Sequence, residues 1–67
     1  MDAKKHKEIE EAIDTVFVFY RYPLSFASLI IKVKELCKYN ELEIRSVIMK
    51  MCDSDKLKLN DRFRVYK

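Results

Sequence analysis

Residues 25–52 read SFASLIIKVKELCKYNELEIRSVIMKMC and predict two amphipathic helices joined by a tight turn. In the first helix the apolar residues recur at helical spacing, as Phe26, Leu29, Ile30, Val33, Leu36 and Cys37. The second helix, from about Glu41 to Cys52, would bury Ile44, Val47, Ile48 and Met51. Ser25 and Asn40 precede the two helices, and both side chains suit an N-cap.

A further helix is predicted before this pair, beginning near Asp2 or Ala3. Its apolar stripe is Ile9, Ala12, Ile13, Val16, Phe17 and Tyr20. The stretch TVFVFY at residues 15–20 would also suit a strand. The unbroken stripe favours a helix, and Pro23 would stop it.

The last twelve residues, KLKLNDRFRVYK, predict a β-hairpin. A two-residue loop would mix charge into the buried face, so a three-residue loop at residues 60–62 is favoured. That register places Leu59 opposite Phe63 and Leu57 opposite Val65, and all four would close the core. The other face and the tip would carry the cations Lys56, Lys58, Arg62, Arg64 and Lys67.

The charge is unevenly distributed along the single domain that 67 residues allow. The net charge is +3, composed of −2 over residues 1–20 and +5 over residues 21–67. This asymmetry suggests an anionic partner, such as a nucleic acid, for the C-terminal part, although a solvated surface would look the same. Glycine is absent, which excludes a P-loop and a dinucleotide-binding fingerprint.

Neither an enzyme nor a cofactor or metal site is expected. His6 is the only histidine, and with Cys37 and Cys52 it supplies too few zinc ligands. No serine has a base at a spacing typical of a nucleophile. Cys37 and Cys52 are interpreted as reduced core residues of an intracellular protein. The protein is expected to be cytoplasmic or nuclear, because no apolar run in the sequence would span a membrane or form a signal peptide.

The predicted order is helix, short extended segment at residues 22–24, helix, tight turn, helix and hairpin. This order and spacing, from PLSFASL through NELEIRSVIMKM to KLKLNDRFRVYK, resembles the winged helix-turn-helix superfamily. The resemblance implies a mainly α fold of three helices plus a C-terminal wing. It also implies that the segment near Pro23 pairs with the hairpin, and that the third helix is the recognition helix. No specific subfamily is indicated.

The function implied by the resemblance is binding of double-stranded DNA, in a regulatory protein. The expected binding residues are Arg45, Ser46, Met49 and Lys50 on the third helix and Lys58, Arg62 and Arg64 on the wing. Arg45 suits bidentate contact with guanine. Glu41, Glu43 and Asp53, on or beside the same helix, count against DNA binding.

Two other functions remain open. A protein–protein interaction module would use Leu42 and Met49 as apolar anchors to bind and modulate a larger protein machine. RNA binding would use the same basic surface.

Val18, Phe19 and Tyr22 are expected to form an exposed apolar strip and the interface of a homodimer.

Overall fold

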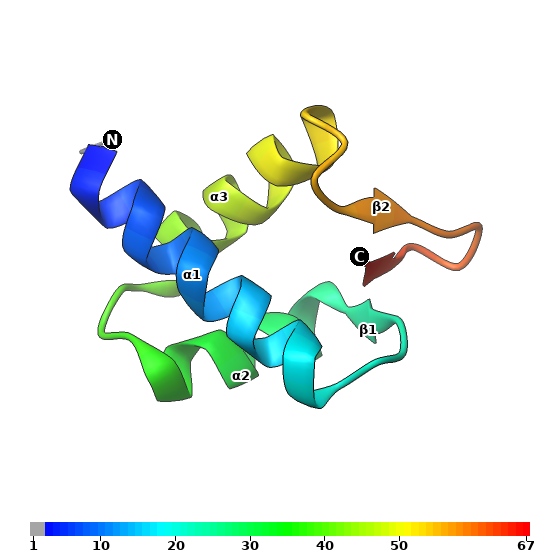
Figure 1. Ribbon diagram of the computed structural model, residues 1–67, viewed down its shortest axis with the longest axis horizontal. Coiled ribbons are helices and arrows are strands. Elements are labelled where there is room, and N and C mark those ends of the chain that lie inside the picture. Colours follow the sequence, from blue (N-terminus) through cyan, green and yellow to red (C-terminus); the bar gives the residue numbers. More distant parts are fainter. Residues whose placement is uncertain (1–2) are drawn as a thin grey trace.

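The computed structural model describes residues 3–67 and contains three helices and a small antiparallel sheet (Figure 1). The helices are α1 (Ala3–Phe19), α2 (Phe26–Leu36) and α3 (Glu41–Asp53), and each packs against the other two. The strands are β1 (Leu24–Ser25), β2 (Lys58–Leu59) and β3 (Arg64–Tyr66). Figure 1 shows the sheet beside the C-terminal end of α1. The predicted order of helices and hairpin is therefore confirmed.

The core lies between the three helices and one face of the sheet. Its buried side chains are Ile9, Ala12, Ile13, Val16, Phe17, Leu24, Leu29, Ile30, Val33, Ile44, Val47, Ile48, Met51, Leu57 and Val65. The helical stripes are thus confirmed, with one exception. Leu36 is exposed; it is the last residue of α2 and borders a hollow with Ala12 and Thr15 of α1.

Side chains cap the beginnings of α2 and α3 as predicted. Ser25 Oγ accepts a hydrogen bond from the Ser28 N–H at 3.2 Å. Asn40 Oδ1 accepts one from the Glu43 N–H at 2.8 Å. Each bond satisfies a backbone donor that has no partner within its helix, so these two residues fix where the helices begin.

The end of α3 directs the chain into the sheet. The Asp55 N–H donates to Cys52 O at 3.2 Å, and the Lys56 N–H donates to Met51 O at 2.9 Å. These two bonds form a Schellman motif, with Asp55 in the left-handed region at φ 61°. Glycine usually occupies this position, but aspartate tolerates it. The following residue, Leu57, then enters the core.

The strand order is β1-β3-β2, with all pairs antiparallel. Leu24 lies opposite Val65 and Ser25 opposite Arg64, so the short extended segment pairs with the hairpin as expected. Leu59, however, lies opposite Val65 rather than Phe63. The predicted register is wrong, because the loop comprises residues 61–63 instead of 60–62.

The Asn60 side chain accounts for this difference. Its Oδ1 accepts hydrogen bonds from the N–H groups of Arg62 and Arg64, both at 2.9 Å. The Phe63 N–H donates to Asn60 O at 3.0 Å, and Phe63 itself adopts φ 58°. The loop is a turn followed by a left-handed residue, a common three-residue hairpin connection. Consequently Phe63 lies in the loop and is 76% exposed. Leu59, on the edge strand β2, is 43% exposed, so the hairpin contributes two core side chains instead of four.

Candidate nucleic-acid interface

The outward face of α3 carries the side chains predicted to bind. Arg45, Met49 and Lys50 are exposed and Ser46 is half-buried, because the opposite stripe of α3 packs into the core. Leu42 lies on the same outward face. Leu42 and Met49 are 76% and 56% exposed, so the centre of this face is apolar.

The two cations of α3 lie on opposite flanks of that apolar centre. Lys50 comes five positions after Arg45, which places the two side chains about 140° apart around the helix. The Arg45 guanidinium lies over the Phe26 ring of α2, 6.0 Å from its centroid, a distance typical of a cation–π contact. Lys50 instead borders a shallow hollow with His6 and Lys56. The structure therefore does not bring Arg45 and Lys50 together.

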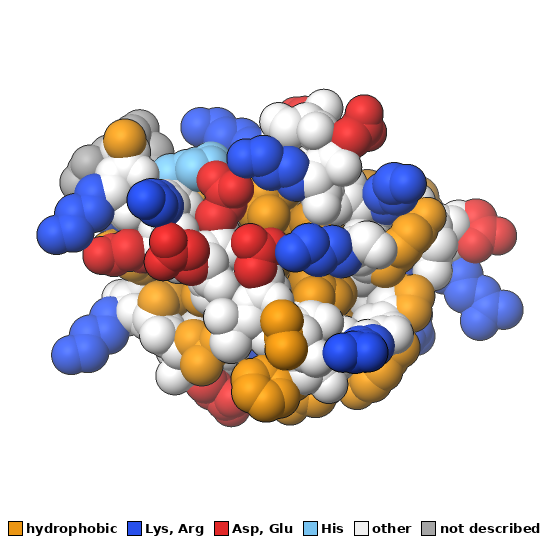
Figure 2. Space-filling model, in the orientation of Figure 1, with side chains coloured by type: hydrophobic (Ala, Val, Ile, Leu, Met, Phe, Trp, Pro, Cys, Tyr) orange, Lys and Arg blue, Asp and Glu red, His pale blue; other side chains and the backbone are white. Residues whose placement is uncertain are grey.

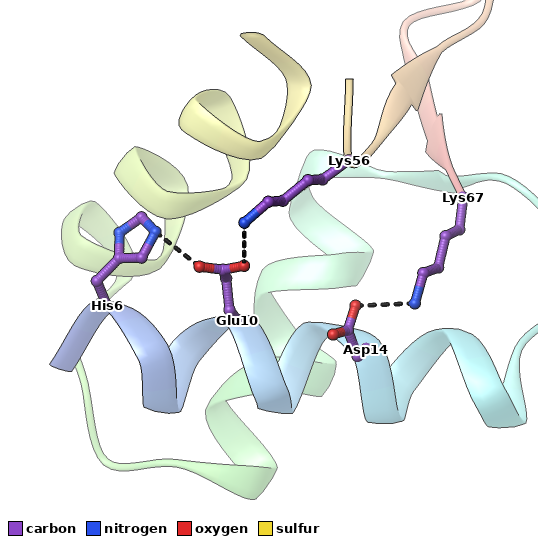
Figure 3. A network of polar contacts seen from close by, with 5 residues as sticks. All are labelled: His6, Glu10, Asp14, Lys56 and Lys67. Carbon is purple, nitrogen blue, oxygen red and sulfur yellow. Dashed lines mark hydrogen bonds and ion pairs between the residues drawn. The ribbon is translucent and has the colours of Figure 1, made fainter. Parts of the chain in front are cut away.

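Acidic side chains of α1 contact two of the hairpin's cations (Figure 3). Lys56 Nζ lies 3.0 Å from Glu10 Oε1, and His6 Nε2 lies 2.9 Å from the other oxygen of Glu10. Lys67 Nζ lies 3.0 Å from Asp14 Oδ1. These contacts direct Lys56 and Lys67 toward α1, away from any anion bound at the tip of the hairpin.

A third acid, at the N-terminal end of α3, is also paired. Lys5 of α1 contacts the Glu43 carboxylate. This contact, helped by the backbone bond at Asn40, holds the pKa of Glu43 below its usual value. Glu43, which the sequence counted against DNA binding, is thus partly neutralised by α1.

The three hairpin cations predicted to bind remain outward. Lys58 lies opposite Tyr66 in the sheet, so these two side chains lie on the same face. Arg64 is two residues before Tyr66 on β3, so Arg64 also lies on this face, which points away from the core. Arg62 is at the tip, where it borders a hollow with Arg64. Within residues 3–67, the side chains of Lys58, Arg62 and Arg64 have no ion-pair partner.

The three residues of the expected dimer strip, Val18, Phe19 and Tyr22, are all exposed as predicted. Val18 and Phe19 are exposed at the C-terminal end of α1, where Figure 2 shows apolar side chains along the lower edge. Tyr22 is also exposed, but it borders the same hollow as Arg62 and Arg64. Its ring packs edge-on against Tyr20, with 6.1 Å between centroids. Sequence reasoning missed that Tyr22 lies beside the hairpin and that Phe63 is exposed between two arginines.

The cysteines pack as predicted, partly buried against the core. Burial raises the pKa of the Cys52 thiol, and the neighbouring Asp53 carboxylate raises it further. A raised pKa disfavours the thiolate, which is the reactive form. Within residues 3–67, no helix has the length and apolar character needed to cross a membrane.

Comparisons of the chain with models of protein families, with curated protein sequences and with solved structures gave no match. A function therefore has to be argued from the arrangement of the residues.

Proposed function

We propose that the chain is a winged helix-turn-helix protein that binds double-stranded DNA and acts as a regulator, with α3 as its recognition helix and the β2–β3 hairpin as its wing. Three packed helices and the β1-β3-β2 strand order support this assignment. They are the elements and the pairing that the superfamily implies.

The observation that carries the proposal is the division of the hairpin's cations into two groups. Lys56 and Lys67 each contact an acidic side chain of α1. Lys58, Arg62 and Arg64 on the wing contact no acidic side chain within residues 3–67. Unpaired cations on a protruding hairpin are suited to phosphate groups, which receive most hydrogen bonds in protein–DNA interfaces.

In this mechanism α3 enters the major groove and the wing holds the backbone. Arg45 is oriented by its contact with Phe26, so it loses less side-chain freedom when it binds a guanine edge. Lys50 extends from the other flank, with Ser46 and Met49 between the two cations. Exposed Glu41 and Asp53 oppose phosphate, so non-specific affinity should be weak, with a dissociation constant of roughly 10⁻⁴–10⁻⁶ M at physiological salt.

The test is a titration of labelled duplex DNA by fluorescence anisotropy at several salt concentrations. Lys58→Ala and Arg64→Ala should each weaken binding to all sequences and reduce the slope of log K against log salt by about 0.9. Lys67→Ala is the matched control, since Lys67 is also exposed but contacts Asp14. Absence of salt-dependent binding by the unmodified protein would overturn the proposal, as would an equal effect of Lys67→Ala.

Loss of a base contact should affect binding differently from loss of a phosphate contact. Arg45→Ala should cost about 1–3 kcal/mol and relax specificity at one position of the site. Selection of binding sites from random duplexes, done with both proteins, measures this directly. Unchanged specificity would show that Arg45 contacts only the backbone or no DNA.

A second function is favoured by the exposed apolar centre of α3. Leu42 and Met49 would anchor a protein partner, with the cations as a polar rim. The deciding comparison is Met49→Ala against the double variant Lys58→Ala, Arg64→Ala. If the first abolishes a protein complex and neither alters DNA binding, α3 is a docking helix. Tighter binding of duplex RNA than of DNA in the same titration would favour RNA as the ligand.

A further inference from the structure

Phe63 occupies an unusual position at the tip of the hairpin. Its side chain is 76% exposed, and it lies between Arg62 and Arg64 in the chain. The loop that presents it is fixed by the two bonds to Asn60 Oδ1 and by the Phe63 N–H bond to Asn60 O. A large apolar ring is therefore presented to solvent on a defined backbone.

The backbone of Phe63 adds a second anomaly. At φ 58° it lies in the left-handed region, where a Cβ crowds the backbone and where glycine or asparagine is the usual residue. Asp55, the other described residue with positive φ, belongs to a type that tolerates this region. A bulky aromatic residue does not, so the conformation at Phe63 is strained. Strain of this kind is concentrated at functional sites.

We propose that Phe63 is a wedge that inserts between two base pairs of duplex DNA from the minor groove. This inference rests on the proposed function and deepens it, since it names the DNA that the wing selects. Apolar side chains at the tips of DNA-binding elements unstack a base step in this way and kink the duplex. The ring would enter the base stack, and Arg62 and Arg64 would remain outside with the flanking phosphates.

Charge complementarity supports duplex DNA as the occupant. The tip carries two arginines against one aspartate, Asp61, and neither arginine has an ion-pair partner within residues 3–67. Arg62 and Arg64 border one hollow that Phe63 does not line, so the tip offers an apolar ring for the base stack and, apart from it, two cations for phosphate groups. Pyrimidine–purine steps unstack most easily, so the wing should prefer sites that contain a TA or CA step.

The test uses a duplex with 2-aminopurine beside a central TA step, because this base fluoresces more strongly when it is unstacked. The unmodified protein should raise the fluorescence on binding. Phe63→Gly removes the ring and suits positive φ, so this variant should melt at the same or a higher temperature. It should still bind with the same salt slope, but without the fluorescence rise and about ten-fold more weakly at the TA site.

Leu59→Ala is the matched control, since Leu59 is an exposed apolar residue of the same hairpin but not at its tip. It should leave the fluorescence rise intact, and Phe63→Tyr should retain it because the ring is kept. An equal rise with Phe63→Gly would overturn the wedge and leave DNA binding standing. Absence of any duplex binding by the unmodified protein would overturn both.

Discussion

The contribution of the hairpin to stability is best tested by replacing one of two leucines at a time. Leu57 is 1% exposed and belongs to the core, whereas Leu59 is 43% exposed. They are two residues apart, so their side chains lie on the same side of the hairpin. Leu57→Ala and Leu59→Ala remove the same atoms, and only the surroundings differ.

The expected magnitudes follow from burial. Replacing a buried leucine by alanine costs about 2–5 kcal/mol, because packing contacts are lost and a cavity remains. A chain of this length has a free energy of unfolding of roughly 3–10 kcal/mol. Leu57→Ala should therefore remove a large part of the stability, or all of it. Leu59→Ala should cost about 1 kcal/mol or less, since nearly half of its surface is already in water.

Urea unfolding followed by circular dichroism at 222 nm, a wavelength that reports helix, measures both values. The unfolding midpoint should fall far more for Leu57→Ala than for Leu59→Ala, with the slope of each transition unchanged. Equal and large losses would refute the reasoning, because they would require both leucines to be in the core, as in the register with the loop at residues 60–62. Removal of residues 56–67 should abolish the cooperative transition, and a truncated protein that keeps it would show that the helices fold without the hairpin.

Three further predictions concern charge and self-association. Contact with Lys5 lowers the pKa of the Glu43 carboxyl, so the stability that ionised Glu43 contributes should be complete above pH 4.5 and should decline as the pH falls through the lowered pKa. The difference in unfolding free energy between the native chain and Glu43→Gln should therefore shrink in acid. An equal difference in urea unfolding at pH 7 and pH 3 would contradict this. Glu10→Gln should free Lys56 and steepen the salt slope of DNA binding by up to about 0.9, whereas an unchanged slope would show that Lys56 does not reach the DNA. If the exposed end of α1 forms a homodimer, light scattering at high micromolar concentration should give a dimer mass that Phe19→Lys halves; a monomeric mass for the native chain rules the dimer out.

The helices could be predicted from the sequence because their signals are local. The apolar spacing of each stripe and the caps at Ser25 and Asn40 depend on residues within a few positions of one another. Leu36 shows the limit of this reasoning. Its place in the stripe indicated burial, but the small residues opposite it belong to α1, and spacing within α2 carries no information about them.

The hairpin register could not be derived from alternation alone. Alternation favoured the pairing that buried four apolar side chains, whereas hydrogen bonds to one side chain, Asn60, select a pairing that buries two. Which of the hairpin's cations form ion pairs could not be predicted from the sequence either. Lys56 and Glu10 are 46 positions apart in the sequence, so only the tertiary structure decides that this lysine is neutralised and Arg64 is not.

The absence of glycine makes the two left-handed positions informative. Asp55 ends α3, and its residue type is explained by the helix stop alone. Phe63 is not explained by its loop, since asparagine would meet the same backbone requirement at lower cost, and its ring adds little to the core. The unpaired Arg62 and Arg64 flank this same residue. The backbone strain and the electrostatics, which are independent features, thus coincide at the tip. A hairpin that only closed the core would need neither, which is why the wing is proposed to contact DNA at its tip.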